Sequence, residues 1–419
     1  MVLESILSSL VKKGNLTVTD WSGLVRKYGD GNPPTSHIKF ESAAAARRMA
    51  IDPDLYIGES YMDGSLKILE GTIADFIDLA MKNVGTTNYH PVHRALDRAR
   101  MALRRIHQHN PVGKAKENVA HHYDLSGAIY DLFLDRDRQY SCAYFETKKS
   151  TLEDAQLAKK RHLAAKLDIR PGMKVLDIGS GWGGLGLYLA EVCGAQVTGV
   201  TLSEEQFKLS NERAHQRDIK GHTEFLLKDY RELEGPFDRI VSVGMFEHVG
   251  IGHFPEFFSK VASLLKDDGA AVLHSINRSN GPGATSAWIK KYIFPGGYVP
   301  ALSEVLPHLE HAGLYVTDIE ILRLHYAETL KEWGHRFATN RAKAAEIYDE
   351  RFCRMWEFYL AASEMAFRYA GMNNFQIQFG KDQNVLPLTR DYIHEQENRL
   401  RKIEAKTPLL KMVGNSRTN

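Results

Sequence analysis

A glycine-rich turn between an apolar strand and an apolar helix constrains the fold of this chain more than any other feature. The turn follows the strand-like segment "MKVLDI" (173–178) and leads into the helix-like segment "GLGLYLAEVC" (184–193). Gly179, Gly181 and Gly184 have the spacing Gly-x-Gly-x-x-Gly. Glycines at such positions let the backbone turn sharply and approach a ligand, and the start of the helix offers free N–H groups. The segment therefore indicates a ligand site at the end of a buried strand.

Strands and helices alternate on the carboxyl side of this turn. Further strands are expected at 196–200, 223–227, 238–243, 270–276, 314–319 and 375–379, and helices at 203–217, 256–265, 302–312 and 342–370. Strands separated by helices favour an open, doubly wound α/β sheet with helices on both faces.

The first 110 residues have a different pattern. Helical periodicity at 2–11 and 72–81, with short alternating stretches at 15–21 and 36–42, predicts a small α+β module. At 419 residues the chain is also long for a single core. We therefore expect four parts, which are an N-terminal α+β module (1–110), a linker with a connecting helix (111–135), a catalytic domain (136–400) and a C-terminal tail (401–419).

Composition narrows the class of protein. Hydrophobic residues make up 43%, charged residues 25%, and the formal net charge is +2, as in ordinary soluble globular proteins. Cys142, Cys193 and Cys353 lie far apart without Cys-x-x-Cys or Cys/His spacing, so neither a disulfide framework nor a zinc site is indicated. The N-terminus lacks the features of a secretory signal, and no apolar run approaches the ~20 residues of a membrane span. These features favour the cytoplasm.

The acidic residues around the glycine turn distinguish between two cofactors. A site for a nicotinamide cofactor requires an acidic residue at the end of the second strand to bind the ribose. Here that strand ends in Gly199-Val200-Thr201. Asp177 instead lies two residues before Gly179. This arrangement resembles the first motif of S-adenosylmethionine (SAM)-dependent methyltransferases and favours SAM over NAD.

Seven further stretches make the resemblance more specific. They are "AHHYDLSGAIYDLFLD" (120–135), "YSCAYFE" (140–146), "LDIGSGWGGLGLYLA" (176–190), "GVTLSEEQ" (199–206), "DRIVSVGMFEHVG" (238–250), "WIKKYIFPGGYVP" (288–300) and "HYAETLKEW" (325–333). Together they resemble cyclopropane-fatty-acyl-phospholipid synthases and the related mycolic acid cyclopropane synthases. "IGESYMDG" (57–64) resembles the N-terminal module of the full-length bacterial phospholipid enzymes. The resemblance implies a Rossmann-like class I SAM methyltransferase sheet with helical insertions behind a small lipid-associated domain.

The resemblance also implies the cofactor site. Tyr140 and Ser141 would lie on SAM, and Asp177 to Gly183, with Gly179 and Gly181, would form the loop beneath it. Thr201 to Gln206 would meet the ribose side. Tyr230 and Arg231 occupy the positions that close over the adenine, although the Arg231 side chain by itself is more typical of a solvated arginine.

The implied reaction needs a base. A cis alkene is a feeble nucleophile, so a strong methyl donor must be held in line with it, and the transferred methyl must then lose a proton before a ring closes. The resemblance to the family implies that this base is a bound bicarbonate. The matching positions here are Cys142, Glu247, His274, the Ile276 backbone and Tyr326.

Neighbouring residues receive structural interpretations. We assign His248 to structure and treat Cys193 and Cys353 as apolar filler. Many family members carry a cysteine where this chain has Ser363. This departure argues against a thiol nucleophile at that position and leaves the bicarbonate interpretation intact.

The substrate implied is the cis-unsaturated acyl chain of a membrane phospholipid, which would be met at the inner face of the membrane. The basic stretch from Arg94 to Lys116 could face anionic head groups or be a solvated helix face, and 288–300 could cover the acyl tunnel. Nucleic acid is not an expected partner, because no aromatic residues interleave the basic ones. A homodimer is expected, since two weak contacts hold a membrane better than one.

Three alternatives remain open on sequence grounds. The first is a SAM-dependent enzyme that methylates the same double bond but leaves a methyl or methylene branch. The second is a small-molecule N-methyltransferase with the same fold, and the third is a non-enzymatic lipid-binding protein.

Overall fold

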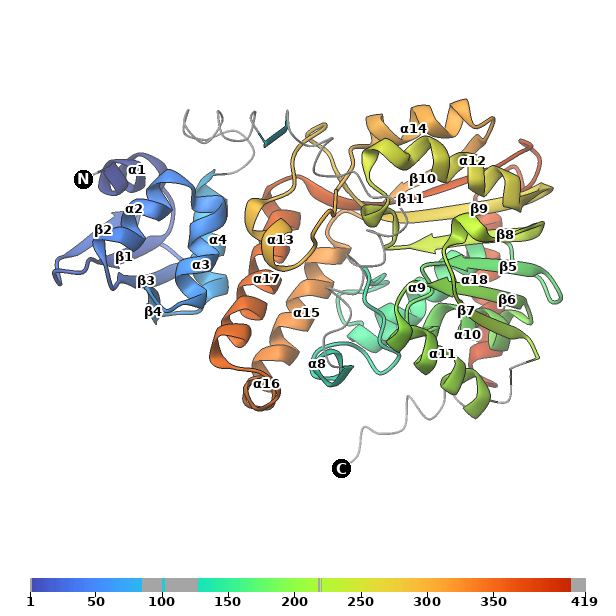
Figure 1. Cartoon of the computed structure of the whole chain (residues 1–419), viewed down its shortest axis with the longest axis horizontal. Helices are drawn as coiled ribbons and strands as arrows, with labels where there is room; N and C mark the ends of the chain where they lie inside the picture. The colour runs from blue at the N-terminus through green and yellow to red at the C-terminus, as the bar shows by residue number, and fades with distance from the viewer. Residues whose placement is uncertain (1, 85–99, 102–126, 218, 220, 408–419) are drawn as a thin grey trace.

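The computed structural model describes residues 2–84, 100–101, 127–217, 219 and 221–407. Figure 1 shows a small sheet and a large sheet at opposite ends of the molecule, with α13 (Ala287–Tyr292), α15 (His325–Thr339) and α17 (Glu350–Tyr369) between them. Among the described residues, none of the helices has both the length and the apolar character of a transmembrane span.

The large sheet has seven strands in the order β10-β11-β9-β8-β5-β6-β7. Their bounds are Lys174–Ile178 (β5), Gln196–Thr201 (β6), Thr223–Leu227 (β7), Phe237–Val243 (β8), Leu265–Arg278 (β9), Tyr315–Ile321 (β10) and Met372–Gly380 (β11). The five strands β7, β6, β5, β8 and β9 are parallel to one another, whereas β11 is antiparallel to both β9 and β10. Strands β6 and β7 extend the sheet on one side of β5. After β7 the chain returns and forms β8 on the other side of β5, so the strand order reverses between β5 and β8. Ligands bind outside the carboxyl ends of strands at such points.

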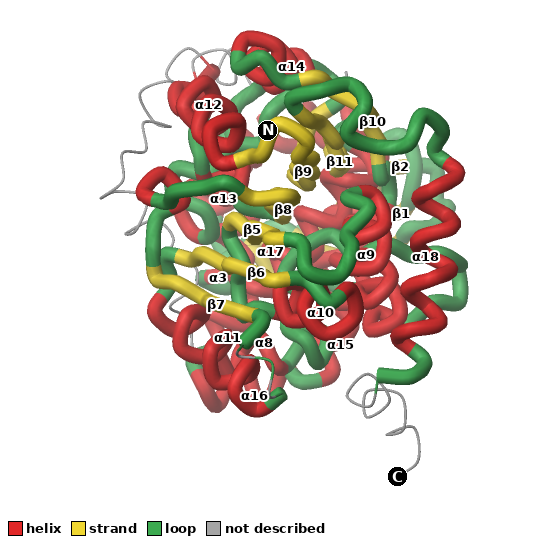
Figure 2. Tube along the Cα trace, turned by 90° about the vertical axis from the view of Figure 1, so that its right-hand side faces the viewer, coloured by secondary structure: helices red, strands yellow, loops and turns green. Residues whose placement is uncertain are grey.

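Both faces of this sheet are covered, as Figure 2 shows. Successive strand residues point to opposite faces, and in β8 Ile240 belongs to one apolar cluster and Val241 to another. The Ile240 side is covered by α12 (Phe254–Leu264) and α14 (Leu302–His311). The Val241 side is covered by α9 (Leu152–Lys166), α10 (Gly184–Cys193) and α18 (Asp391–Glu404). The predicted doubly wound sheet is therefore confirmed.

Shorter elements complete this domain. They are α8 (Gly127–Asp131), α11 (Glu204–Gln216), α16 (Arg341–Ile347) and the 3₁₀ turns η1 (Tyr230–Glu232), η2 (Phe246–His248) and η3 (Ile251–His253). The helix expected over 342–370 is broken between α16 and α17, where Asp349 caps α17 by accepting from the Phe352 N–H at 2.7 Å. Helix α18 crosses position 401, where the sequence places the start of a tail.

The N-terminal module contains a four-stranded sheet in the order β2-β1-β3-β4. Its strands are Asn15–Thr19 (β1), Val25–Gly29 (β2), Thr35–Phe40 (β3) and Leu66–Glu70 (β4), and its helices are Val2–Leu10 (α1), Ala43–Ile51 (α2), Pro53–Met62 (α3) and Ile73–Val84 (α4). Sequence analysis did not predict β2 or β4. Each is an edge strand and most of its residues are exposed, so the alternation that marks a half-buried strand is weak. Of the predicted basic stretch 94–116, only Arg100 and Met101 lie within the described residues.

The segment "IGESYMDG" attaches this module to the catalytic domain. Its Glu59 accepts hydrogen bonds from Lys291 Nζ at 2.6 Å and Tyr292 Oη at 2.9 Å. Its Tyr61 donates to Glu357 of α17 at 2.9 Å. Gly58 packs so closely that a Cβ there would lie 2.4 Å from Nε1 of the buried Trp288.

Gly58→Ala is expected to destabilise the protein by about 1–3 kcal/mol, because the added methyl overpacks the contact with Trp288. Gly334→Ala is the matched control, since Gly334 also lies inside a helix but a Cβ there meets nothing within 4 Å. The control should stabilise the protein by about 0.5–1 kcal/mol through helix propensity. Denaturant unfolding of both variants measures the difference, and equal effects would contradict the close contact.

Candidate active site

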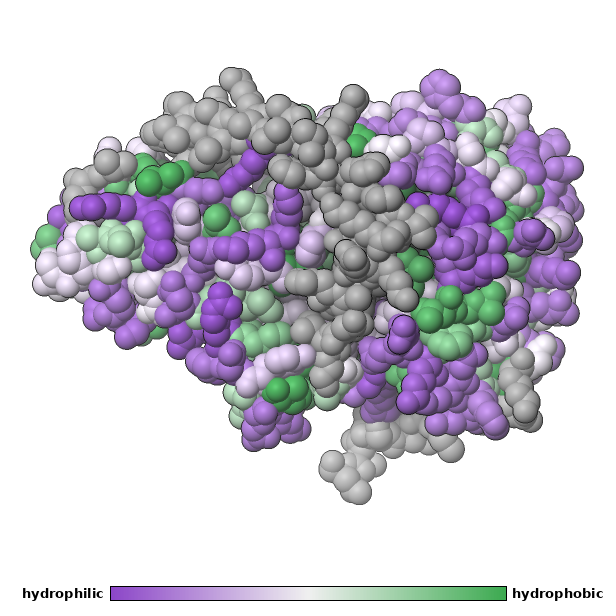
Figure 3. Space-filling model, in the orientation of Figure 1, coloured by the Kyte–Doolittle hydropathy of each residue, from purple (hydrophilic) through white to green (hydrophobic). Residues whose placement is uncertain are grey.

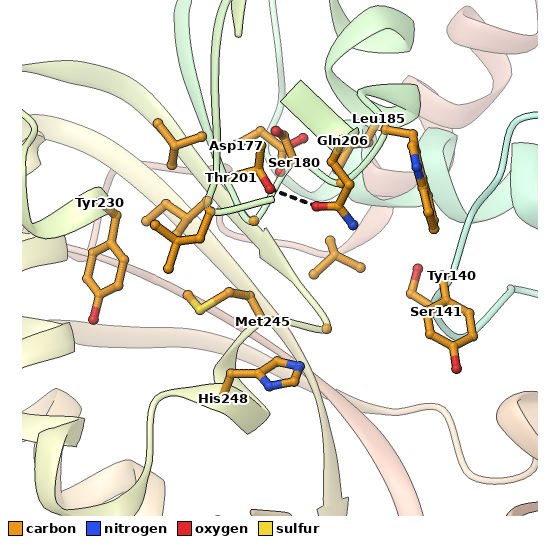
Figure 4. A pocket seen from close by; sticks show the side chains of 18 of the residues that line it. Tyr140, Ser141, Asp177, Ser180, Leu185, Thr201, Gln206, Tyr230, Met245 and His248 are labelled. Atoms are coloured by element: carbon orange, nitrogen blue, oxygen red, sulfur yellow. Dashed lines mark hydrogen bonds between the residues drawn. The ribbon is translucent and has the colours of Figure 1, made fainter. Parts of the chain in front are cut away.

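A pocket opens at the carboxyl ends of β5, β6 and β8, where the strand order reverses. Of the candidate cofactor residues, those that line it are Tyr140, Ser141, Asp177, Gly179, Gly181, Thr201, Gln206, Tyr230 and Arg231. Figure 4 shows Tyr140 and Ser141 at one end, Tyr230 at the other, and Asp177, Thr201 and Gln206 between them. The pocket is thus an elongated site assembled from five separate stretches of sequence.

The glycines of the turn have different roles. Gly179 has φ +83°, and a Cβ there would lie 2.7 Å from the Cβ of Met245, so both its conformation and its packing require glycine. Gly183 does not line the pocket. It caps α10 with φ +80°, and a Cβ there would lie 2.8 Å from the Cβ of Ser210.

Asp177 is a buried acid that faces the pocket (Figure 4). It is 1% exposed, and its Oδ2 has no hydrogen-bond partner among the described residues. Burial raises the pKa of this carboxyl to about 7. An unpartnered carboxylate aimed into a cavity suits a cationic group such as an ammonium.

Two further groups shape the middle and far end of the pocket. Thr201 Oγ1 donates to Gln206 Oε1 at 2.7 Å, which leaves the Gln206 amide nitrogen directed at the pocket (Figure 4). A solvated guanidinium is typical of an arginine at such a position, but the Arg231 side chain is largely buried. It forms two hydrogen bonds with the Asp229 carboxylate, at 2.9 and 2.7 Å, and so stiffens the wall beside Tyr230.

Two of the candidate base residues, Glu247 and Ile276, meet near the ends of β8 and β9. Glu247, in the 3₁₀ turn after β8, accepts from the Ile276 N–H through Oε1 at 2.6 Å. Its Oε2 is buried without a hydrogen-bond partner among the described residues, and burial raises the pKa of Glu247 to about 7. The Ile276 N–H thus fixes the orientation of the Glu247 carboxylate, and its Oε2 remains able to accept a hydrogen bond from a ligand.

The other candidates have separate surroundings. The His274 ring nitrogens lie 3.1 Å from Gln376 Nε2 and 3.3 Å from Asn374 Nδ2, so the sheet engages both of them. Burial lowers the pKa of His274 to about 3, which keeps the ring neutral. Cys142 is fully buried, and its pKa is raised well above the usual range of a thiol. Such a thiol is a poor nucleophile at neutral pH.

A second, larger cavity of about 1,200 Å³ lies between the N-terminal module and the catalytic domain. Ile276 and Tyr326 line it on the catalytic side, and Leu7, Phe76 and Ile77 line it on the module side. The cavity is also lined by Ser363, the position where many family members carry a cysteine, and by four residues of the segment 288–300. These four are Trp288, Ile289, Phe294 and Val299. The cavity therefore runs from Ile276 and Tyr326, two of the five candidate base residues, to the apolar interior of the module.

Comparison with known proteins assigns the chain to a family. The family model of mycolic acid cyclopropane synthetase matches residues 111–377. The chain belongs to this family. Residues 2–90 match a second domain family, whose function is unknown.

Members of the family show the same relationship in sequence and structure. Cyclopropane-fatty-acyl-phospholipid synthase of Escherichia coli K12 is 37% identical over 355 residues, which cover 84% of this chain and 89% of the relative. A Pseudomonas putida protein named "Probable fatty acid methyltransferase" is 39% identical over 287 residues, 66% of this chain and 73% of its own. The structure of mycolic acid cyclopropane synthase CmaA1 complexed with SAH and CTAB is 33% identical, has a TM-score of 0.60, and covers 63% of this chain and 97% of its own. The chain is accordingly a SAM-dependent methyltransferase.

The residues that line the first pocket have polar and aromatic groups that fit SAM. The carboxylate of Asp177 suits the ammonium of the methionine moiety, the Gln206 amide suits hydroxyl groups, and the aromatic ring of Tyr230 suits a purine. When bound, SAM supplies an electrophilic methyl group. Asp177, Gln206 and Tyr230 are the residues that would bind and orient it.

Sequence analysis missed several pocket residues. Asp229, Met245 and His248 line the pocket, and Figure 4 shows the His248 ring facing it, although the sequence indicates a structural role for this residue. Burial lowers the pKa of His248 to about 4, so the ring is neutral. Their signal was positional, since Asp229 follows β7 and the other two follow β8 at the carboxyl edge of the sheet.

SAM affinity should fall as the pH drops below about 7. Burial raises the pKa of Asp177, so the carboxyl becomes protonated and neutral below that value and no longer attracts the ammonium. Isothermal titration calorimetry between pH 6 and 8 measures the effect. Asp177→Asn should bind SAM about 10- to 100-fold more weakly at pH 8 and lose this pH dependence. A pH dependence that persists in the variant would contradict this role.

Proposed function

We propose that this enzyme transfers a methylene group from SAM to the cis double bond of unsaturated acyl chains in membrane phospholipids and forms cyclopropane fatty acids. The observation that carries the proposal is the large cavity, which is mostly apolar and reaches Ile276 and Tyr326, two of the candidate base residues. Its volume of about 1,200 Å³ exceeds the ~300–1,000 Å³ of ordinary small-molecule pockets, as a long chain requires. The E. coli relative carries the name of this activity.

A bound bicarbonate would serve as the base in this proposal. The two oxygens of Glu247 support it, because Oε1 is held by the Ile276 N–H while Oε2 has no partner among the described residues. Ionised Glu247 would accept the hydrogen of bicarbonate through Oε2 and so direct the anion's basic oxygens at the transferred methyl. Tyr326 and Cys142 would donate to those oxygens. His274 can join this set only by releasing one of its two amide partners.

Ring closure also requires water to be kept away from a carbocation. The walls available for this are aromatic: Tyr326 packs 5.8 Å from Trp333 and 4.8 Å from Phe367, measured between ring centroids. Aromatic walls of this kind exclude water from the reacting centre.

The N-terminal module would present the lipid. In α1 the residues Leu3, Ile6, Leu7 and Leu10 line the large cavity. Figure 3 shows apolar surface over this helix, among other apolar patches on the same face. We propose that the enzyme acts as a homodimer at the cytoplasmic face of the membrane and draws one acyl chain into the cavity beside α1.

Incubation of the purified enzyme with SAM and vesicles of cis-monounsaturated phospholipid tests the proposal. Mass spectrometry should show a gain of one CH₂ per modified chain, and NMR should show ring protons. A branched chain would instead support methylation of the same bond, a second candidate that the name of the P. putida relative favours. No mass gain would contradict both functions.

Glu247→Gln should abolish turnover and leave SAM binding unchanged, because the amide can no longer accept a hydrogen bond through both oxygens. Cys142→Ser should reduce turnover more mildly, since a hydroxyl still donates. Turnover is measured as above, and SAM binding by calorimetry. An equal and complete loss in Cys142→Ser would favour a covalent role for the thiol.

A further inference from the structure

We infer that Lys159 supplies the positive charge that holds the carboxylate of the methionine moiety of SAM, and that it acts through Ser141. Lys159 belongs to α9, outside the stretches that carry the family resemblance. It is a positioning residue in this proposal, since Ser141 makes the contact with the cofactor. The inference rests on SAM as the methyl donor and does not depend on the acyl substrate.

The hydrogen bonds of Lys159 fix the direction in which Ser141 donates. The Lys159 side chain is fully buried, and its Nζ lies 2.8 Å from Ser141 Oγ and 2.7 Å from Gln139 Oε1. An ammonium has donors and no acceptor, so Ser141 Oγ must accept from it. The hydroxyl hydrogen of Ser141 is then available to an acceptor in the pocket, which both Ser141 and Gln139 line.

The charge of Lys159 lacks a close counter-ion. No carboxylate of the described residues lies within 4.0 Å of Nζ, and its two hydrogen-bond partners are neutral. Burial lowers the pKa of Lys159 to about 8, with Asp135 and Asp137 acting to raise it and Lys160 to lower it. The side chain therefore keeps its proton at neutral pH. A buried, unpaired ammonium beside a ligand pocket is costly, and an anionic ligand offsets that cost.

The pocket has the opposite charge at a neighbouring position. Asp177 carries the unpartnered carboxylate described above, and it lies close enough to Lys159 for the lysine to lower its pKa. A zwitterionic amino acid fits such a pair, with its ammonium at Asp177 and its carboxylate at Ser141. This places the methionine end of SAM at Tyr140 and Ser141, and the purine at Tyr230, as the layout in Figure 4 allows.

Gln156, one turn before Lys159 on the same helix, provides a neutral comparison. Its Nε2 donates to the backbone oxygens of Ser141 at 3.0 Å and Gln139 at 3.2 Å. Gln156 and Lys159 thus hold the same segment of chain from the same side. Only Lys159 adds charge.

The test compares ligands that differ at the carboxylate. SAM, decarboxylated SAM and 5′-methylthioadenosine are titrated by calorimetry at pH 7 into the wild-type enzyme, Lys159→Met, Lys159→Gln and Gln156→Met. The wild type should prefer SAM to decarboxylated SAM by at least about 10-fold. Both Lys159 variants should lose about 10- to 100-fold in SAM affinity and bind the other two ligands within about threefold of the wild type.

Three results would overturn the inference. The first is a wild-type enzyme that binds SAM and decarboxylated SAM equally, a result that needs no variant to fold. The second is a Lys159 variant that weakens all three ligands alike, which is the behaviour expected of Gln156→Met and of a merely structural residue. The third is a folded Lys159 variant with unchanged SAM affinity. Failure of the lipid assay would leave these binding results intact, so the two proposals are tested separately.

Discussion

The parallel pairing of β8 with β5 is the constraint on which the rest of the structure depends. Because β6 and β7 extend the sheet on one side of β5 and β8 begins the other side, the helices that follow β5 and β8 diverge and leave a crevice between them. The glycine turn after β5 and the segment Met245–His248 after β8 form its two walls. Every other part of the site is added to this crevice, from the 139–142 segment at one end to Tyr230 at the other.

The N-terminal module acts on the site through packing. Gly58 lets α3 approach Trp288, and Glu59 and Tyr61 form hydrogen bonds with α13 and α17. These contacts hold the apolar faces of α1 and α4 against the catalytic domain, where they enclose the large cavity. A mycolic acid synthase matched over 97% of its own length covers only 63% of this chain, so the module is an addition to the catalytic fold. We propose that the addition serves a substrate that must be withdrawn from a bilayer.

Buried charge without an ion-pair partner among the described residues is the common feature of the functional positions. Asp177 and Glu247 each have a raised pKa and an oxygen without a partner among the described residues, and Lys159 has no close carboxylate there. Several other buried charges of the domain form ion pairs, as where Arg161 meets Glu404 at 3.1 Å and Lys166 meets Glu320 at 2.6 Å. Paired charges stabilise the fold, whereas unpaired ones are tolerated where a ligand supplies the missing partner.

The sequence by itself determined the fold class and most of the cofactor pocket. Alternating apolar segments and the Asp177-x-Gly179 turn are local patterns, and a parallel sheet always brings the carboxyl ends of its strands together. The sequence could not show that His248 faces the pocket, that Asp229 engages Arg231, or that Lys159 reaches Ser141 from a helix with no motif of its own. Those facts depend on side-chain direction and on contacts between distant elements. Only the tertiary structure decided them, because burial and the presence or absence of a counter-charge arise when the chain packs and are not properties of any residue type.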